Sequence, residues 1–267
     1  MPSPDRTNDY LLEVEGLAKA FKGLQALQDY HLHLRPSEIV GIIGPNGAGK
    51  TTIFNVVTGF YPPSAGKVIF DGHDITYSPP DVVTRLGLVR TFQNVRLFGE
   101  LTVLDNVKAA QQLHTPRSLT STILSLPSFL QREKEVEERT LTLLETFGLA
   151  ERRTTLARNL PYGDQRRLEI ARALATGPKV LLLDEPAAGM NPHETDELHQ
   201  LILYIREHFN LTIVLVEHDM RLVMNLCERI QVLNYGRIIA EGPPDEIRND
   251  PQVVEAYLGH VNEGRAA

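Results

Sequence analysis

The sequence is poor in cysteine and in long apolar runs, and it has no tryptophan. Cys227 is the one cysteine among 267 residues, so an internal disulfide is excluded and a reducing compartment suits the chain. No apolar run approaches the roughly 20 residues that a membrane-spanning helix needs. The polar residues 1–8 also lack the apolar core of a secretory signal. We therefore expect a soluble chain that reaches any membrane through a partner, with Cys227 as a buried structural thiol.

Positive charge is scarce as well. Lys and Arg number 27 against 34 Asp and Glu, a net charge of -7. The chain thus lacks the basic surplus of a nucleic-acid-binding protein, and we expect no nucleic-acid partner. The pairs Arg152-Arg153 and Arg166-Arg167 are interpreted as solvated or helix-terminal charges. His31 and His33 share one face of an expected strand, and without a third ligand nearby they indicate a solvated face.

What the sequence does contain is a phosphate-binding loop between an apolar run, 39–43, and a helix-compatible run, 51–57. Its spacing is that of G-x-x-x-x-G-K-[ST]. Its glycines let backbone N–H groups converge on an anion, and the helix adds its positive end. Lys50 is predicted to reach the β- and γ-phosphates, and the Thr51 hydroxyl to hold Mg²⁺. The predicted phosphate contacts are Gly44, Pro45, Asn46, Gly47, Ala48, Gly49, Lys50, Thr51 and Thr52.

Two adjacent carboxylates end a later apolar run, 180–183. Because successive strand residues point to opposite faces, we expect Asp184 and Glu185 to have different roles. Asp184 is predicted to hold Mg²⁺ through its water shell, and Glu185 to polarise the attacking water. His218 follows the next apolar strand at its carboxyl end, where open α/β sheets bind ligands. Lys50, Glu185 and His218 are therefore the predicted catalytic residues.

The pattern along the chain predicts an α/β fold. We expect a P-loop NTPase core with a mostly parallel central sheet, an antiparallel β sub-domain and an inserted helical sub-domain. Expected strands include 10–14, 30–34 and 66–72, and expected helices include 131–147 and 193–209, with an irregular insertion over 115–128 and a hairpin over 229–241. The predicted divisions are 10–98 for the first part of the core with the β sub-domain, 99–176 for the helical sub-domain, 177–242 for the second part of the core and 243–267 for a helical tail.

Two further stretches complete a recognisable set of motifs. They are Arg90-Thr91-Phe92-Gln93 and the run 159–174, which contains Leu160-Pro161-Tyr162-Gly163-Asp164. In order and spacing, the set resembles the ATP-binding subunits of ABC transporters over roughly residues 10 to 260. The resemblance implies that ATP and Mg²⁺ bind and that Gln93 touches Mg²⁺ and links the site to a membrane subunit. It further implies that Phe21 stacks on adenine, that Tyr162, Gly163 and Asp164 belong to the signature motif that meets ATP, and that 188–191 is the D-loop.

Several stretches look like one branch of that family, the ATP-binding subunits of branched-chain amino-acid importers. They are 90–98, the signature, 186–192, 217–220, 247–251 and 256–259. The resemblance implies ATP hydrolysis that powers uptake, at the cytoplasmic face of the inner membrane. The implied partners are a second ATP-binding subunit in a heterodimer or homodimer, membrane permease subunits, and a periplasmic or extracellular substrate-binding protein. The block after Gln93, with Arg96, Leu97 and Phe98, is where a membrane subunit is expected to dock.

The signature departs from the general Leu-Ser-Gly-Gly-Gln of the family. Pro161 replaces the serine, Tyr162 the first glycine and Asp164 the glutamine, so the hypothesis is a complete phosphate loop beside a weakened signature. Three alternatives stay open: the ATPase of a lipopolysaccharide export system, a urea or short-chain amide transporter, and a soluble ABC ATPase outside transport. The signature helix and His218 disfavour a small P-loop kinase or GTPase.

Overall fold

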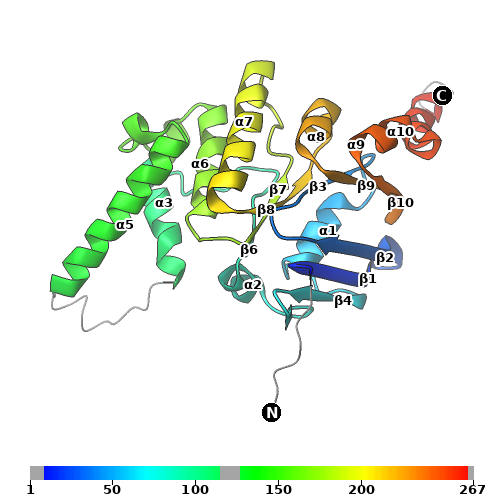
Figure 1. Ribbon diagram of the computed structural model, residues 1–267, viewed down its shortest axis with the longest axis horizontal. Coiled ribbons are helices and arrows are strands. Elements are labelled where there is room, and N and C mark those ends of the chain that lie inside the picture. Colours follow the sequence, from blue (N-terminus) through cyan, green and yellow to red (C-terminus); the bar gives the residue numbers. More distant parts are fainter. Residues whose placement is uncertain (1–8, 115–126, 264–267) are drawn as a thin grey trace, which may run out of the picture.

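A six-stranded sheet forms the centre of the molecule (Figure 1). The computed structural model describes residues 9–114 and 127–263. Within them the strand order is β10-β9-β3-β8-β7-β6, parallel throughout except for the edge strand β10. The strands are β3 (Ile39–Ile43), β6 (Leu88–Arg90), β7 (Val180–Asp184), β8 (Thr212–Val216), β9 (Arg229–Asn234) and β10 (Arg237–Gly242). This confirms the predicted mostly parallel core sheet.

Alternate residues of the central strands face two different layers. Ile213 and Leu215 of β8 belong to one apolar cluster, together with α6 (Tyr162–Leu174), α7 (Pro192–Phe209) and α8 (Met220–Leu226). Val214 and Val216 belong to a second cluster, which joins α1 (Lys50–Val57) to the antiparallel sheet. The strands are therefore buried on both faces, as their continuous apolar runs predict. This burial fixes the carboxyl ends of β3, β7 and β8 relative to one another.

The antiparallel sheet has the order β2-β1-β4-β5. It consists of β1 (Leu12–Phe21), β2 (Leu24–Leu34), β4 (Ala65–Phe70) and β5 (His73–Asp74). The predicted strands at 10–14 and 30–34 are real but too short, because β1 and β2 continue through register shifts into a long hairpin. A positive φ at Gly16 and at Asp29 marks these irregularities, which interrupt the alternation of apolar and polar residues.

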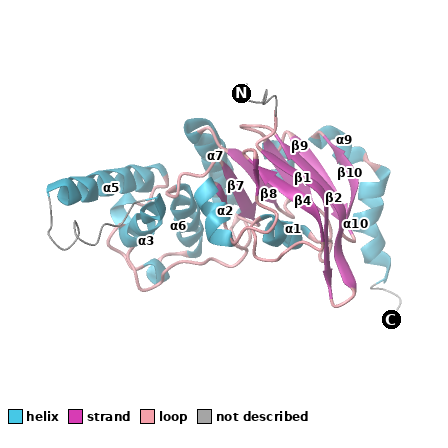
Figure 2. Cartoon of the chain, turned by 90° about the horizontal axis from the view of Figure 1, so that it is seen from below, coloured by secondary structure: helices cyan, strands magenta, loops and turns pink. Residues whose placement is uncertain are grey.

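The helical region lies at the opposite end of the molecule from the antiparallel sheet (Figures 1 and 2). Its main helices are α3 (Val103–Gln111), α5 (Pro127–Thr146) and α6, with short 3₁₀ turns at Gln112–His114, Ala150–Arg152 and Ala157–Asn159. Thr102 caps α3 by accepting the Asp105 N–H at 3.1 Å. The predicted irregular insertion ends too late, because Pro127 and Ser128 already belong to α5. Residues 115–126 of that insertion lie outside the described residues.

The remaining elements complete the core and the tail. The predicted hairpin is β9 and β10, and its turn has positive φ at Tyr235 and Gly236. Helices α2 (Pro80–Leu86), α9 (Pro244–Asn249) and α10 (Pro251–Glu263) complete the described chain, and the last two agree with the helical tail predicted from residue 243 on. None of the helices in the described ranges is long and apolar enough to cross a membrane.

Candidate functional site

The predicted phosphate loop joins the end of β3 to the start of α1. Its backbone needs glycine: Gly44, Gly47 and Gly49 have φ of 149°, 80° and 110°. A Cβ on Gly44 would lie 2.1 Å from the carbonyl oxygen of Leu233, so no side chain fits there. The loop is fixed from behind because the Gly236 N–H donates to the Ala48 carbonyl at 2.8 Å. The turn between β9 and β10, which is distant in sequence, thus contacts the loop and supports it.

Lys50 is folded back onto this loop. Its Nζ donates to the carbonyl oxygens of Gly44 at 2.6 Å and Pro45 at 3.1 Å, and the side chain is buried. Burial lowers the pKa of Lys50, and the negative charges of Glu185 and Asp184 oppose that shift. Thr51 is exposed at the first turn of α1, and Thr52 is half-buried. The structure therefore places Lys50 in the same electrostatic field as the two carboxylates.

Asp184 closes β7 and is paired with an arginine that the sequence reading did not assign. Arg90, at the end of the neighbouring strand β6, donates to Asp184 Oδ2 at 2.9 Å, and the two side chains are 5% and 1% exposed. Asn55 of α1 also receives a bond from Arg90, at 2.7 Å. Burial raises the pKa of Asp184, against the lowering effect of Arg90. Among the described residues, Asp184 Oδ1 is buried without a hydrogen-bond partner.

Glu185 leaves the strand rather than continuing it. Its φ is 48°, so the prediction from strand alternation used the wrong geometry: β7 ends at Asp184. The two carboxylates nevertheless have different partners. Gln93, exposed in the segment after β6, donates its amide to Glu185 Oε2 at 2.9 Å. Gln93, Glu185, Asp184 and Lys50 therefore lie together at the carboxyl end of the central strands.

His218 follows β8 on a segment held by Glu217. The Glu217 carboxylate is fully buried and accepts the N–H groups of Ala187 at 2.9 Å and His218 at 3.1 Å. Burial raises the pKa of Glu217, and these N–H donors oppose the shift. The His218 side chain is 64% exposed, with Nδ1 3.7 Å from Glu217 Oε2. Sequence reasoning missed Glu217 as the residue that joins the segments after β7 and β8; its charge at the end of an apolar strand was the available signal.

The predicted signature residues begin α6, with Pro161 as the N-cap. Asp164 pairs with Arg152 at 2.6 Å, and Arg152 is 48% exposed at the end of a 3₁₀ turn, in line with its interpretation as a solvated or helix-terminal charge. A Cβ on Gly163 would lie 2.8 Å from Glu194 Oε1 of α7. Within the described chain no hydrogen bond or ion pair joins Tyr162 or Asp164 to the phosphate loop. Within the described chain, the signature residues are therefore bonded to their own helix and to Arg152 and not to the phosphate loop.

Phe21, the predicted adenine contact, ends β1 on the surface. It is 37% exposed, and its ring meets Tyr61 edge-on with centroids 5.3 Å apart. Lys19 Nζ lies 5.0 Å from the centre of the Phe21 ring. Phe21 is therefore an accessible aromatic face and not a core residue, and its contact with adenine stays a prediction.

No cluster of three or more His, Cys, Asp or Glu side chains suitable for a metal ion exists in the part of the chain that is described. His31 instead bonds Glu15 at 2.8 Å and Asp29 at 3.0 Å, and His33 bonds Glu15 at 2.5 Å. A magnesium ion would therefore depend on scattered oxygen donors together with phosphate and water, which is how Mg²⁺ is usually bound beside nucleotides.

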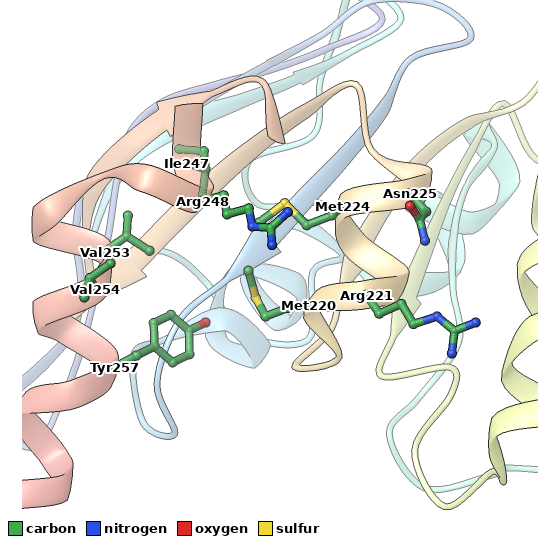
Figure 3. A pocket seen from close by; sticks show the side chains of 9 residues that line it. All are labelled: Met220, Arg221, Met224, Asn225, Ile247, Arg248, Val253, Val254 and Tyr257. Carbon is green, nitrogen blue, oxygen red and sulfur yellow. The ribbon is translucent and has the colours of Figure 1, made fainter. Parts of the chain in front are cut away.

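A cavity of about 680 Å³ lies apart from these residues, between α8 and the two tail helices (Figure 3). Its lining is mostly apolar, with Met220, Met224 and Val253 among the residues around it. None of the predicted site residues lines it. Tyr257 of α10 borders this cavity; burial raises the pKa of its hydroxyl, and the backbone of Gly44 opposes that shift.

Comparisons with known proteins agree with this geometry. The family model described as "ABC transporter" matches residues 27–188, and that described as "Branched-chain amino acid ATP-binding cassette transporter" matches residues 237–261. The chain is 51% identical over 251 residues to the high-affinity branched-chain amino acid transport ATP-binding protein LivG of Escherichia coli, covering 94% of this chain and 98% of that protein. The lipopolysaccharide export system ATP-binding protein LptB of Escherichia coli is 38% identical, covering 93% of this chain and 97% of that protein. The solved ADP conformation of MJ1267, an ATP-binding cassette of an ABC transporter, has a TM-score of 0.81 and 32% identity, covering 94% of this chain and 99% of that one.

Proposed function

The chain belongs to the ATP-binding proteins of ABC transporters, and from this premise we propose that it hydrolyses ATP to power uptake of branched-chain amino acids through membrane permease subunits. The higher identity to LivG, 51% against 38% for LptB, supports an importer of this kind over a lipopolysaccharide exporter. The match of residues 237–261 to the branched-chain family model supports the same choice. A urea or short-chain amide cargo is the alternative to be tested.

One observation carries the ATPase part of the proposal: a loop that only glycine can form lies beside Lys50 and two carboxylates with separate partners. The loop N–H groups and Lys50 would bind and orient the triphosphate. Glu185, which accepts a hydrogen bond from Gln93 at 2.9 Å, would take a proton from the attacking water. The oxygen of that water would at the same time bond to the γ-phosphorus. The bond from that phosphorus to the bridging oxygen breaks, and ADP leaves as phosphate forms. His218 would contact the γ-phosphate and stabilise the developing charge.

The residues present fit a magnesium ion. Asp184 Oδ1 is buried and has no hydrogen-bond partner among the described residues, and the Thr51 hydroxyl is exposed at the start of α1. Oxygen donors of this kind are the ones that Mg²⁺ prefers. We assign Thr51, Asp184 and Gln93 as its protein contacts, where the bound ion would neutralise charge on the β- and γ-phosphates.

The proposal includes partners. A second ATP-binding subunit, the same or different, would bring its signature to this phosphate loop, and permease subunits would dock after Gln93. A groove of about 460 Å³ there is bordered by Phe60, Phe92 and Phe98, and Phe98 is 54% exposed. Such exposed aromatic side chains are typical of a protein interface. We place the subunit on the cytoplasmic face of the cell membrane, in a complex with an extracytoplasmic substrate-binding protein.

The test replaces the proposed base. Glu185→Gln keeps the size and the hydrogen-bonding oxygen but loses the proton acceptor, so ATP binding should change less than about 3-fold while turnover falls at least about 100-fold. Nucleotide titration and phosphate release by the complex with its permease measure the two quantities. Glu197→Gln, on the exposed face of α7, is the control. Normal hydrolysis by Glu185→Gln would show that another group is the base.

The cargo is tested separately in proteoliposomes that contain the whole complex and the substrate-binding protein. Leucine, isoleucine and valine should enter with ATP consumption, and urea should not. Urea uptake without leucine uptake, or extraction of lipid, would exclude the proposed substrate and leave the ATPase assignment intact.

A further inference from the structure

Arg166 and Glu169 form a buried ion pair on α6. Their side chains are 1% and 2% exposed, and Arg166 Nη1 lies 3.1 Å from Glu169 Oε2. The prediction that Arg166-Arg167 is a solvated pair is therefore wrong for Arg166, whereas Arg167 pairs near the surface with Glu197. A buried ion pair is weak evidence for stability, because removing two charges from water offsets their attraction. The pair therefore calls for a role other than stabilising the fold.

The two side chains hold the backbone of the segment that carries Gln93. Arg166 donates to the carbonyl oxygen of Phe92 at 2.7 Å and to that of Gln93. Glu169 accepts the N–H of Arg96 at 3.1 Å. Residues 91–98 form neither a helix nor a strand, so side-chain bonds of this kind fix their position. Because guanidinium is a rigid fork, it also fixes the orientation of the two carbonyl groups.

Tyr162 extends this arrangement to the segment after β7. Its hydroxyl accepts a hydrogen bond from Arg166 Nε at 3.1 Å. Its ring lies against Gly189: a Cβ on Gly189 would be 3.2 Å from Tyr162 Cε1. The contacts therefore run without a gap from Gly189 through Tyr162 and Arg166 to the backbone of Gln93. The Gln93 side chain then bonds Glu185 at 2.9 Å.

We propose that Tyr162, Arg166 and Glu169 are positioning residues that hold Gln93 against Glu185 and tie its place to the start of α6. The proposal rests on the proposed function, because it takes Glu185 as the base. A displacement of α6 would move the Gln93 backbone with it, and small displacements at a reacting centre cost large factors in rate. Tyr162, which replaces the first glycine of the general signature, thereby gains a role within its own chain.

The first test is a double-mutant cycle in the assembled complex. Arg166→Lys keeps the charge beside Glu169 but loses the fork, and we expect kcat to fall about 10-fold or more, with KM for ATP changing less than about 3-fold. Arg167→Lys, the neighbouring residue on the same helix, should leave kcat unchanged. If Arg166 acts through Gln93, then Arg166→Lys should add less than about 2-fold to the loss already caused by Gln93→Ala. Independent multiplication of the two losses, or a normal kcat for Arg166→Lys, would overturn the proposal.

The second test measures position without activity. Arg166→Lys in the full chain should speed hydrogen exchange at the amides of residues 92–96 at least about 10-fold, and Arg167→Lys should not. Tyr162→Phe removes only one hydroxyl from a half-exposed side chain, so it keeps the test valid if Arg166→Lys does not fold. It should speed the same amides, whereas Tyr204→Phe on α7 should not. Unchanged hydrogen exchange at the amides of residues 92–96 in a folded variant would refute the proposal that these side chains position the segment.

Failure of the proposed base and failure of the positioning proposal give different results. Hydrolysis by Glu185→Gln would refute the proposed base, and the exchange data would still decide whether Arg166 fixes the segment. An inactive Glu185→Gln together with unchanged exchange in Tyr162→Phe and Arg166→Lys would refute the positioning proposal alone.

Discussion

At the scale of single residues, Lys50 shows how the site is held ready for an anion. Its ammonium group is buried and donates hydrogen bonds to the carbonyl oxygens of Gly44 and Pro45. Burial lowers its pKa, while Asp184 and Glu185 oppose that shift and favour the charged form. Phosphate oxygens can replace the carbonyl oxygens as stronger, charged acceptors.

Lys50→Ala should therefore lose nucleotide affinity by about 10- to 100-fold. A hydrogen bond to a charged group contributes about 1.5–3 kcal/mol, and every 1.4 kcal/mol is tenfold. Titration with a fluorescent ATP analogue measures the loss, and Lys179→Ala, whose exposed side chain pairs with Asp71, is the control. Equal affinity in both variants would remove Lys50 from the phosphate site.

Residue types and spacing could predict the phosphate loop, because Gly44 and Gly49 are required by backbone conformation and by close approach of other chain segments. They could not predict the partner of Asp184. Arg90 reaches it because β6 pairs in parallel with β7, a neighbour relation that no local pattern contains. The burial of Arg166 was missed for a similar reason. Two adjacent arginines are predicted to be solvated, and the sequence does not show that the segment around Phe92 and Gln93 covers one of them.

At the scale of elements, the hairpin of β1 and β2 carries a histidine and a glutamate whose pKa values the fold shifts in opposite directions. The His31 pKa is raised from 6.5, chiefly by the hydrogen bond to Glu15. The Glu15 pKa is lowered from 4.5, chiefly by the hydrogen bond to His33. The His31 contribution to stability is complete below pH 6.5 and is lost as pH rises through its folded pKa. The Glu15 contribution is complete above pH 4.5 and is lost as pH falls through its folded pKa.

His31→Gln should therefore destabilise the chain most between about pH 4.5 and pH 6.5, with a smaller difference on either side. The side chains are 45% and 47% exposed, so solvent screening limits the effect to about 1 kcal/mol or less. Urea unfolding across this pH range measures it, with His73→Gln as the control. A difference that does not vary with pH would contradict the assignment.

The start of α6 allows a second test at this scale. Pro161 gives the helix no side-chain cap, and Asp164 is paired with Arg152 instead of facing the phosphate loop. Pro161→Ser with Asp164→Gln restores two of the three departures from the general signature and should raise turnover of the complex several-fold if the signature is weakened. A serine cap also stabilises a helix by about 0.5–2 kcal/mol, so thermal unfolding is measured alongside ATPase activity. Higher stability with unchanged turnover would show that the native signature is already competent.

Element patterns also show where prediction from sequence ends. The hairpin of β9 and β10, the tail helices and the buried strands β7 and β8 follow from turn residues and apolar runs. The full lengths of β1 and β2 do not, because register shifts break the alternation on which the prediction relied. Strand alternation also could not predict the bend at Glu185, because β7 ends at Asp184 and Glu185 has a φ of 48°.

At the scale of the whole molecule, no hydrogen bond or ion pair of the described chain joins the phosphate loop to Tyr162 or Asp164 of the signature. Asp164 pairs with Arg152, and the loop is supported by Gly236. If both are needed around one ATP, a second molecule must supply one of them. Association should then depend on nucleotide, because ATP would fill the interface between the two.

Glu185→Gln, which should bind ATP without cleaving it, is expected to form dimers with ATP and Mg²⁺ but not with ADP. Light scattering after size exclusion measures the mass, first for this chain alone and then with the second ATP-binding subunit. Adding Lys50→Ala to the same chain should return the monomer. Dimers that form equally without nucleotide would separate association from the ATP site.

The thiol of Cys227 has a practical consequence. Burial raises its pKa to about 12, so at neutral pH it stays protonated and is poorly accessible to alkylating probes. Because Cys227 is the one cysteine of the sequence and is buried, the protein presents no exposed thiol. A spin label or a fluorophore could therefore be attached specifically at one introduced surface cysteine, without first replacing Cys227.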